Sequence, residues 1–162
     1  MSEFEKNPHR TRIERLVTAM SIRTGPMEVP QFGTGAGLTS GHWAAMLSGF
    51  PGDGETALHY VMLLAGEPRH RKPLIARLMY FLSPKILMGM PSLTLSGSDL
   101  RDVVAVTVDA ERHGGKVMPA DAARGGIKRK RWERLKPVHQ MTVDALDDVA
   151  DQVVRHLARA CS

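Results

Sequence analysis

The chain has 162 residues, of which 43% are hydrophobic and 24% are charged, and its formal net charge is +5. These proportions fit a globular protein with a buried core and exclude an intrinsically disordered chain. The single cysteine, Cys161, excludes an internal disulfide and a thiolate zinc site, which suits a reducing compartment. Apolar runs stay shorter than the ~18 residues of a membrane span, and the N-terminal residues lack a signal-peptide core. We therefore expect a cytoplasmic protein.

The segment 1–41 predicts one helix followed by a loop. Pro8 suits a first helical position, and apolar residues recur at helical spacing as far as Met20, which predicts a helix over 8–22. The glycines and prolines that follow, from Gly25 onward, oppose any regular element. The glycine run 33–37 is not followed by Lys-Ser or Lys-Thr, so it predicts a flexible connector rather than a phosphate-binding loop.

The segment 42–96 predicts a helical body, in which short apolar stretches follow one another between turn residues. Asp53 suits the N-cap of one helix, and Pro73 suits the first position of the next. Ser83-Pro84 is expected to end that helix and to begin another. The expected helices span 42–50, 55–65, 73–82 and 85–90.

The segment 97–162 predicts a helix, a helix-turn-helix and a long final helix. The apolar pattern from Leu100 favours a helix that Gly114-Gly115 would end, although the β-branched run 103–108 leaves a strand open. Over 138–160 apolar residues recur at helical spacing, with aspartates between them that predict a solvated polar side rather than an acidic site. These aspartates are Asp144, Asp147, Asp148 and Asp151. The predicted fold is therefore all-α, a helical body with a C-terminal helix-turn-helix followed by a long amphipathic helix.

The stretch 118–136 fits a helix-turn-helix, whose tight corner needs a small residue on the first helix and a glycine at the turn. Ala122 and Gly126 are four residues apart, as this corner requires. Apolar residues fall under the turn and on one side of the second helix, where they are expected to be buried: Ile127, Trp132 and Leu135. The pattern has two departures, at positions where apolar residues are commoner: Asp121 and Gly125.

The same stretch carries much of the positive charge. Between residues 128 and 136 six basic residues stand against one acid, Glu133. With the apolar side inward, a turn of ~100° per residue points Lys130 and Arg134 outward. Arg129 and Glu133 then lie on one flank of this pair, and Arg131 lies on the other. Such a row can enter the major groove, where arginine pairs with guanine, glutamate accepts from cytosine and other cations hold phosphates. The alternative is an ordinary solvated basic helix face. The expected DNA contacts are Arg124, Lys128, Arg129, Lys130, Arg131, Glu133, Arg134 and Lys136.

Several short motifs occur in a fixed order from about Gly37 onward. They are the two apolar helices expected over 55–66 and 73–82, Met118-Pro119-Ala120-Asp121-Ala122-Ala123, Trp132, and Lys136-Pro137 followed by a helix through Asp144-Ala145-Leu146. In this order the chain resembles the Q-type late transcription antitermination proteins of lambda-like (lambdoid) bacteriophages. Some members carry paired cysteines of zinc-binding type before the helix-turn-helix, where this chain has residues 111–116. The resemblance is thus to a zinc-free variant, with no cofactor.

The resemblance implies a protein that works in the cytoplasm of a bacterial host and binds double-stranded DNA at a Q binding element near a late promoter. It also implies that the protein joins bacterial RNA polymerase paused just downstream, at the flap region of the β subunit and with the sigma factor present at loading. The polymerase then reads through later pauses and terminators. A contact with nascent RNA at the exit channel is left open.

Two further basic groups have two interpretations, as positive walls beside a passing RNA backbone or as scattered solubilising charges. These groups are Arg10, Arg12 and Arg15, and Arg69, His70, Arg71, Lys72 and Arg77.

The sequence offers no candidate for enzyme chemistry, so we expect neither a catalytic residue nor a metal site. The seven histidines form no HExxH or similar ligand spacing and are expected at the surface or partly buried. Two other functions remain open beside antitermination. One is a helix-turn-helix regulator of transcription initiation, and the other is a phage DNA-packaging adaptor. A stable complex with elongating polymerase distinguishes the first function from both.

Overall fold

The computed structural model describes residues 44–45, 47–111 and 117–160. These ranges consist of helices joined by turns and loops and contain no strand, which confirms the all-α prediction for the part of the chain described. The helix expected over 8–22, the loop after it and the basic group at 10–15 lie outside these ranges. Of the helix expected over 42–50, residues 42, 43 and 46 lie outside them, and residues 47–49 form a turn in which Gly49 has a φ of +75°, so the prediction of a helix that continues to residue 50 is wrong.

Contacts divide the molecule into two compact units. Unit 1 contains the described residues as far as Arg71 together with those from Asp147 onward, and unit 2 is Lys72–Leu146. Each unit is defined by contacts, and unit 1 combines two segments that are distant in sequence. It therefore does not test the predicted division into 1–41, 42–96 and 97–162, which follows the order of the sequence. That division stays a prediction.

Unit 1 is built around α3, which spans Gly54–Leu64. As expected, Asp53 caps this helix, and its carboxylate accepts from the backbone N–H groups of Glu55 and Thr56 at 3.1 and 3.2 Å. The 3-10 helix η2, Pro68–His70, follows and contacts α3. The fully buried Tyr60 contributes to the core of this unit.

Unit 2 begins with most of α4, which spans Arg71–Gly89 and passes through Pro84. The prediction that Ser83-Pro84 ends a helix and begins another is wrong. On either side of the proline, Leu82 and Ile86 are buried at 1% and 3% exposure. Their burial stabilises a single helix and offsets the ~3 kcal/mol that an internal proline costs.

Helix α5 spans Gly97–Glu111 and settles the choice left open between helix and strand. Leu100, Val104 and Val108 recur at every fourth residue and are buried, so the β-branched run packs as one side of a helix. The hydroxyl of Thr107 donates to the carbonyl of Val103 at 2.7 Å, which satisfies a buried polar group within the helix.

Helix α7 spans Arg129–Ala160 and passes through Pro137. The sequence predicts two helices, one ending before this proline and one beginning after it, but the structure has one. Leu135 and Val138 are fully buried on either side of Pro137, so the same apolar side continues through it. The first part of α7, as far as Leu146, belongs to unit 2, and the rest belongs to unit 1.

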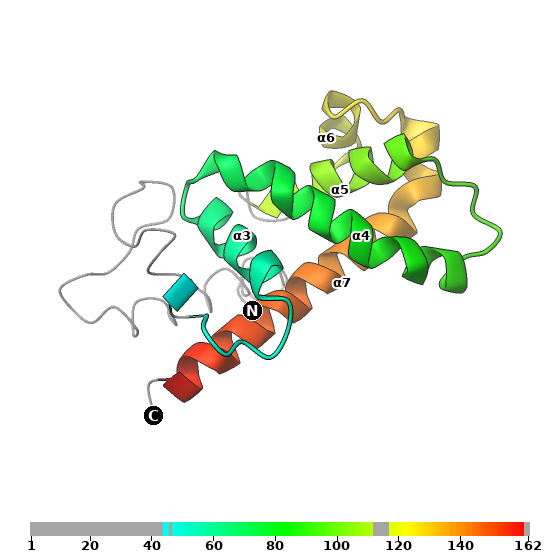
Figure 1. Ribbon diagram of the computed structural model, residues 1–162. Coiled ribbons are helices and arrows are strands. Elements are labelled where there is room, and N and C mark those ends of the chain that lie inside the picture. The colour runs from blue at the N-terminus through cyan, green and yellow to red at the C-terminus, as the bar shows by residue number, and fades with distance from the viewer. Residues whose placement is uncertain (1–43, 46, 112–116, 161–162) are drawn as a thin grey trace, which may run out of the picture. The chain divides into compact units, whose positions relative to one another are not determined.

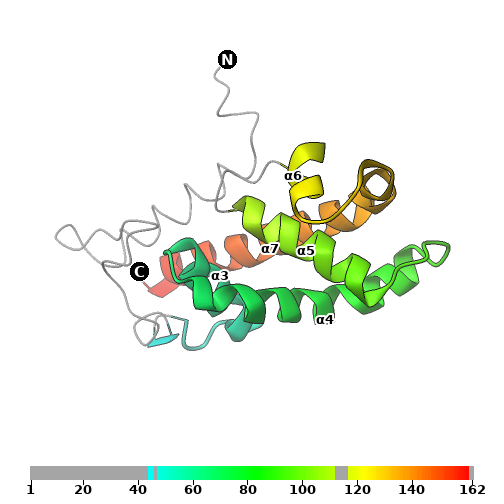
Figure 2. The ribbon, with the colours of Figure 1, turned by 90° about the horizontal axis from the view of Figure 1, so that it is seen from above.

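Within unit 2, Figure 1 shows α4 alongside α5, with the short helix α6, Pro119–Arg124, next to α5 and to the start of α7. Figure 2 shows the same arrangement from above. Among the described helices, none combines the length and the apolar character that crossing a bilayer requires.

Candidate nucleic-acid interface

Helix α6 and the turn after it position the start of α7. Pro119 takes the first position of α6, as the sequence predicts. Gly126 has a φ of +89°, in the left-handed region that favours glycine. Ala122 before the turn and Ile127 after it are both fully buried. A glycine conformation and two buried apolar side chains therefore fix this turn.

The two departures from the usual helix-turn-helix pattern have local physical causes. The carboxylate of Asp121 accepts from the backbone N–H of Met118 at 2.8 Å, so it caps the start of α6. A Cβ placed on Gly125 would overlap Cγ2 of Val106 on α5. An apolar side chain at this position would push α6 away from α5, and glycine permits the close approach.

The inward side of α7 is apolar and well packed. Trp132 and Leu135 are 2% and 0% exposed, which confirms that both are core residues. The ring of His139 lies 5.2 Å from the indole of Trp132, and its Nδ1 is 2.8 Å from Oγ1 of Thr107. Because this hydroxyl donates its hydrogen to Val103, the imidazole Nδ1–H is the donor to Thr107.

The outward side of α7 carries the basic residues. Lys128, Arg129 and Lys130 are exposed, and within the described ranges none of their side chains has a hydrogen bond or an ion pair. Arg134 lies one turn after Lys130, and its side chain is 49% exposed. Lys130 and Arg134 lie on the side of α7 opposite to Trp132, Arg129 lies on a flank of that side, and Lys128 directly precedes the helix.

Other predicted contact residues are paired at the surface. Nζ of Lys136 lies 2.9 Å from a carboxylate oxygen of Glu133, and both side chains are about half exposed. Arg124 forms an ion pair with Asp121 on α6. Exposed pairs of this kind contribute only ~0–1 kcal/mol, so a polyanion can exchange with either carboxylate at little cost.

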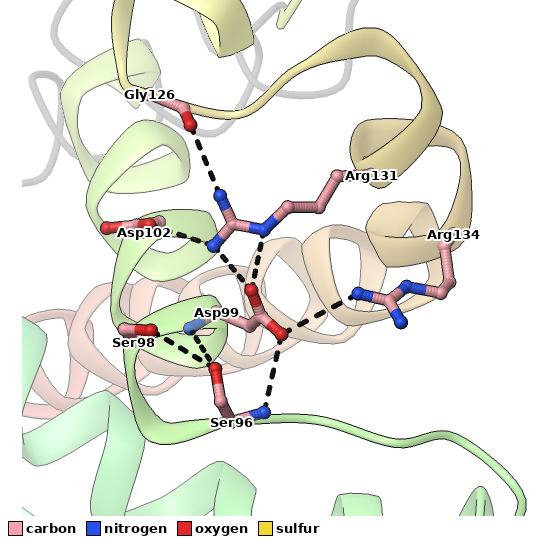
Figure 3. A network of polar contacts seen from close by, with 7 residues as sticks. All are labelled: Ser96, Ser98, Asp99, Asp102, Gly126, Arg131 and Arg134. Carbon is pink, nitrogen blue, oxygen red and sulfur yellow. Dashed lines mark hydrogen bonds and ion pairs between the residues drawn. The ribbon is translucent and has the colours of Figure 1, made fainter.

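Arg131 departs from the prediction, because it does not flank an open basic face. Figure 3 shows its guanidinium turned toward α5 and the turn before α7. Nε donates to Asp99 at 2.6 Å, Nη2 donates to Asp102 at 3.0 Å, and Nη1 donates to the carbonyl of Gly126 at 3.2 Å. These bonds raise the pKa of Arg131 further, the one to Asp102 most. The two carboxylates on α5 outcompete solvent for this side chain, so Arg131 ties α7 to α5.

Asp99 links this network to the start of α5 (Figure 3). Its carboxylate accepts from the backbone N–H of Ser96 at 3.3 Å, and its own N–H donates to Oγ of Ser96 at 3.1 Å, which is a capping box. Burial opposes ionisation of Asp99, but the hydrogen bonds from Arg131 and Ser96 outweigh it and hold the pKa of this carboxyl below its usual value. Asp99 is therefore a fixed negative charge beside the basic helix.

Comparisons with protein-family models, curated proteins and solved structures find no match for this chain. The interpretation of the site therefore depends on the chemistry and geometry of its own residues.

Sequence reasoning missed the acidic partners of the basic helix. Asp99 and Asp102 lie about 30 residues before Arg131, and no local pattern connects them. The sequence does contain one usable signal, because Ser96 is followed by Asp99 at capping-box spacing before an apolar run. That signal locates the start of α5 but does not predict its ion pairs with α7.

The predicted absence of a metal site stays a prediction for the whole chain. Within the described ranges, no group of three or more His, Cys, Asp or Glu side chains is placed to hold a metal ion. The glycine run at 33–37 lies outside those ranges.

Proposed function

We propose that this protein binds double-stranded DNA through a helix-turn-helix and acts as a Q-type late transcription antitermination factor. In this proposal α6 is the first helix, Gly126 makes the turn, and the start of α7 is the recognition helix. The observation that carries it is the division of α7 into two sides, with Trp132 and Leu135 buried and a row of exposed cations opposite. The step from DNA binding to antitermination is supported by the order of motifs along the sequence.

In this proposal some of the exposed cations contact backbone phosphates and others contact base edges. Lys128, directly before α7, and Arg129, at its first position, hold backbone phosphates and set the position of the helix on the duplex. Lys130 and Arg134, one turn apart, reach base edges, where arginine pairs bidentately with guanine. Arg131 contributes by orientation, because its bonds to α5 fix the angle at which α7 leaves the turn.

Antitermination also needs a contact between the protein and RNA polymerase that persists after the polymerase has left the DNA element. We assign this contact with RNA polymerase to exposed apolar residues of α4. Tyr80, Leu87 and Met88 are 84%, 73% and 87% exposed, and their spacing places them on one side of the helix. The chain has no acidic residue between Glu67 and Asp99, so this surface suits a protein partner that combines apolar and acidic groups.

The deciding experiment is single-round transcription with purified bacterial RNA polymerase, on a template that carries the cognate promoter region followed by an intrinsic terminator. The wild-type protein should increase the full-length RNA. A Lys130→Ala/Arg134→Ala variant should fail to load, and a Leu87→Ser/Met88→Ser variant should bind the DNA but lose read-through. Equal termination with and without the protein, on a template to which it binds, would leave an initiation regulator as the better function.

A packaging adaptor is distinguished in the same assay. Such a protein would bind DNA without changing either promoter output or termination. It would also form no stable complex with a stalled elongation complex in a pull-down, whereas an antitermination factor remains attached to it.

A further inference from the structure

Asp99 lies between two arginines of α7 (Figure 3). Its Oδ1 accepts from Nε of Arg131 at 2.6 Å, and its Oδ2 lies 3.7 Å from Nη2 of Arg134. The side chain of Asp99 is 13% exposed, whereas that of Arg134 is 49% exposed. The carboxylate is therefore held in place, while Arg134 can turn outward into solvent.

The two arginines are held with different strength. Arg131 donates hydrogen bonds to three acceptors, two carboxylates and one backbone carbonyl. Arg134 makes an ion pair with Asp99 at a separation beyond normal hydrogen-bond length. A partly exposed pair of this kind shifts an equilibrium by only ~1- to 5-fold. Arg134 is thus the arginine that a ligand can draw away.

From this geometry we infer that Asp99 competes with DNA for Arg134 and so lowers the affinity of the protein for duplex DNA. The inference rests on the DNA-binding part of the proposed function. A backbone phosphate offers Arg134 the same kind of single ionic contact that Asp99 already provides, so the exchange gains little. A guanine edge offers two parallel hydrogen bonds, which discriminate by roughly 5- to 150-fold. The Asp99–Arg134 pair is broken completely only where Arg134 gains the stronger contact, so Asp99 weakens binding to the cognate duplex more than binding to an arbitrary one.

Asp102 provides a matched control on the same helix. It carries the same charge three residues further along α5, and it accepts from Nη2 of Arg131. In the described part of the chain no hydrogen bond or ion pair joins it to Arg134. Neutralising Asp102 therefore changes the net charge and loosens Arg131 without releasing Arg134.

The experiment compares wild type, Asp99→Asn and Asp102→Asn with two duplex probes, one of random sequence and one selected from a random pool by the wild-type protein. Asparagine at residue 99 still accepts from Ser96, so the cap of α5 is retained, and circular dichroism checks the fold. For Asp99→Asn we expect a dissociation constant about 2- to 5-fold lower on the selected duplex and a smaller decrease on random duplex. On random duplex its salt dependence should steepen by about one released counterion.

The gain should disappear when Asp99→Asn is combined with Arg134→Ala. Tightening on the selected duplex that is no larger than on random duplex, an equal effect of Asp102→Asn, or a gain that survives Arg134→Ala would overturn the inference while leaving DNA binding intact. Failure of the wild-type protein to bind either duplex would overturn the DNA-binding proposal together with it. Tightening on single-stranded RNA alone would assign the competition to another ligand and also reject the inference.

Discussion

Two segments of the chain, 69–77 and 128–136, carry similar runs of basic residues and have different surroundings. In the first, His70 is buried, Arg69 pairs with Glu67 at 3.6 Å, and Lys72 belongs to a different unit. In the second, a single helix begins at Arg129, and buried side chains on one side of it leave the cations other than Arg131 exposed. A run of basic residues forms a charged face when most of it lies on one helix whose opposite side is buried.

The largest effect on stability should follow from removing a large side chain from the buried side of α7. Trp132→Ala is expected to lower the free energy of unfolding by roughly 3–5 kcal/mol, because a fully enclosed aromatic is removed from unit 2. Urea unfolding of the full chain measures this change, and Lys130→Ala, on the exposed side, should stay within about 0.5 kcal/mol of wild type. An unchanged unfolding midpoint together with lost DNA affinity would make Trp132 a DNA contact and break the comparison.

The next effect separates the two basic runs directly. Lys130→Ala/Arg134→Ala should weaken DNA binding by on the order of 1–3 kcal/mol for each base edge that the variant no longer reads. Arg69→Ala/Lys72→Ala removes the same net charge from the first run and should change the affinity by less than about twofold on a cognate duplex at physiological salt. Gel-shift titrations of both variants measure the difference. Equal losses would mean that total charge, not the α7 face, governs binding.

The sequence was a good guide wherever a local rule decides the structure. Asp53 as a cap, Pro119 as a first helical residue and the burial of Trp132 all follow from neighbours within a few positions. The sequence-based prediction was wrong at Pro84 and Pro137, where it expected one helix to end and another to begin. In the structure one helix continues through each proline, because buried side chains on both sides of it stabilise the helix.

The candidate site was predictable to a similar extent. Periodicity placed Lys130 and Arg134 opposite the buried side of α7, but it also placed Arg131 at the edge of an open face. The carboxylates that hold Arg131 come from α5, and a pairing between Asp99 and Arg131 depends on how two helices pack. No spacing rule within one helix contains that information.

A third, smaller effect concerns this tie between helices. Arg131→Gln should lower the free energy of unfolding by about 1–3 kcal/mol at pH 7, because Asp99 and Asp102 lose their charged donor. Arg131→Lys should recover only part of the loss, since an ammonium group cannot reproduce the forked geometry.

The effect of Arg131→Gln should also depend on pH. Because Arg131 lowers the folded-state pKa of Asp99, its contribution is complete above the unfolded carboxyl pKa of about 3.9 and is lost as the pH falls through the folded value. Wild type and Arg131→Gln should therefore converge in stability in acid. A gap between their unfolding midpoints that stays constant from pH 7 to about pH 2.5 would show that Arg131 acts only through packing.

The smallest effect concerns the protonation of His70, which determines how much positive charge the basic run 69–77 has in mild acid. Nδ1 of His70 lies 2.9 Å from Nδ1 of His59, so one ring donates and the other accepts, and both cannot be cations without repulsion. Burial, then the charges of His59 and Arg69, lower the pKa of His70, and Glu67 opposes them only in part.

A lowered histidine pKa means that, as the pH falls, the unfolded chain binds the proton before the folded chain does. The contribution of His70 to stability is thus complete above the unfolded value of about 6.5 and is lost as the pH falls below it toward the folded value. Wild type should lose more stability than His70→Asn between pH 7.5 and pH 5.5, a range in which most carboxylates stay ionised, and the difference should be under about 1 kcal/mol. Thermal unfolding of both proteins at the two pH values measures it. Identical losses would mean that His70 titrates as an exposed histidine does, and the first run would then gain a cation in mild acid.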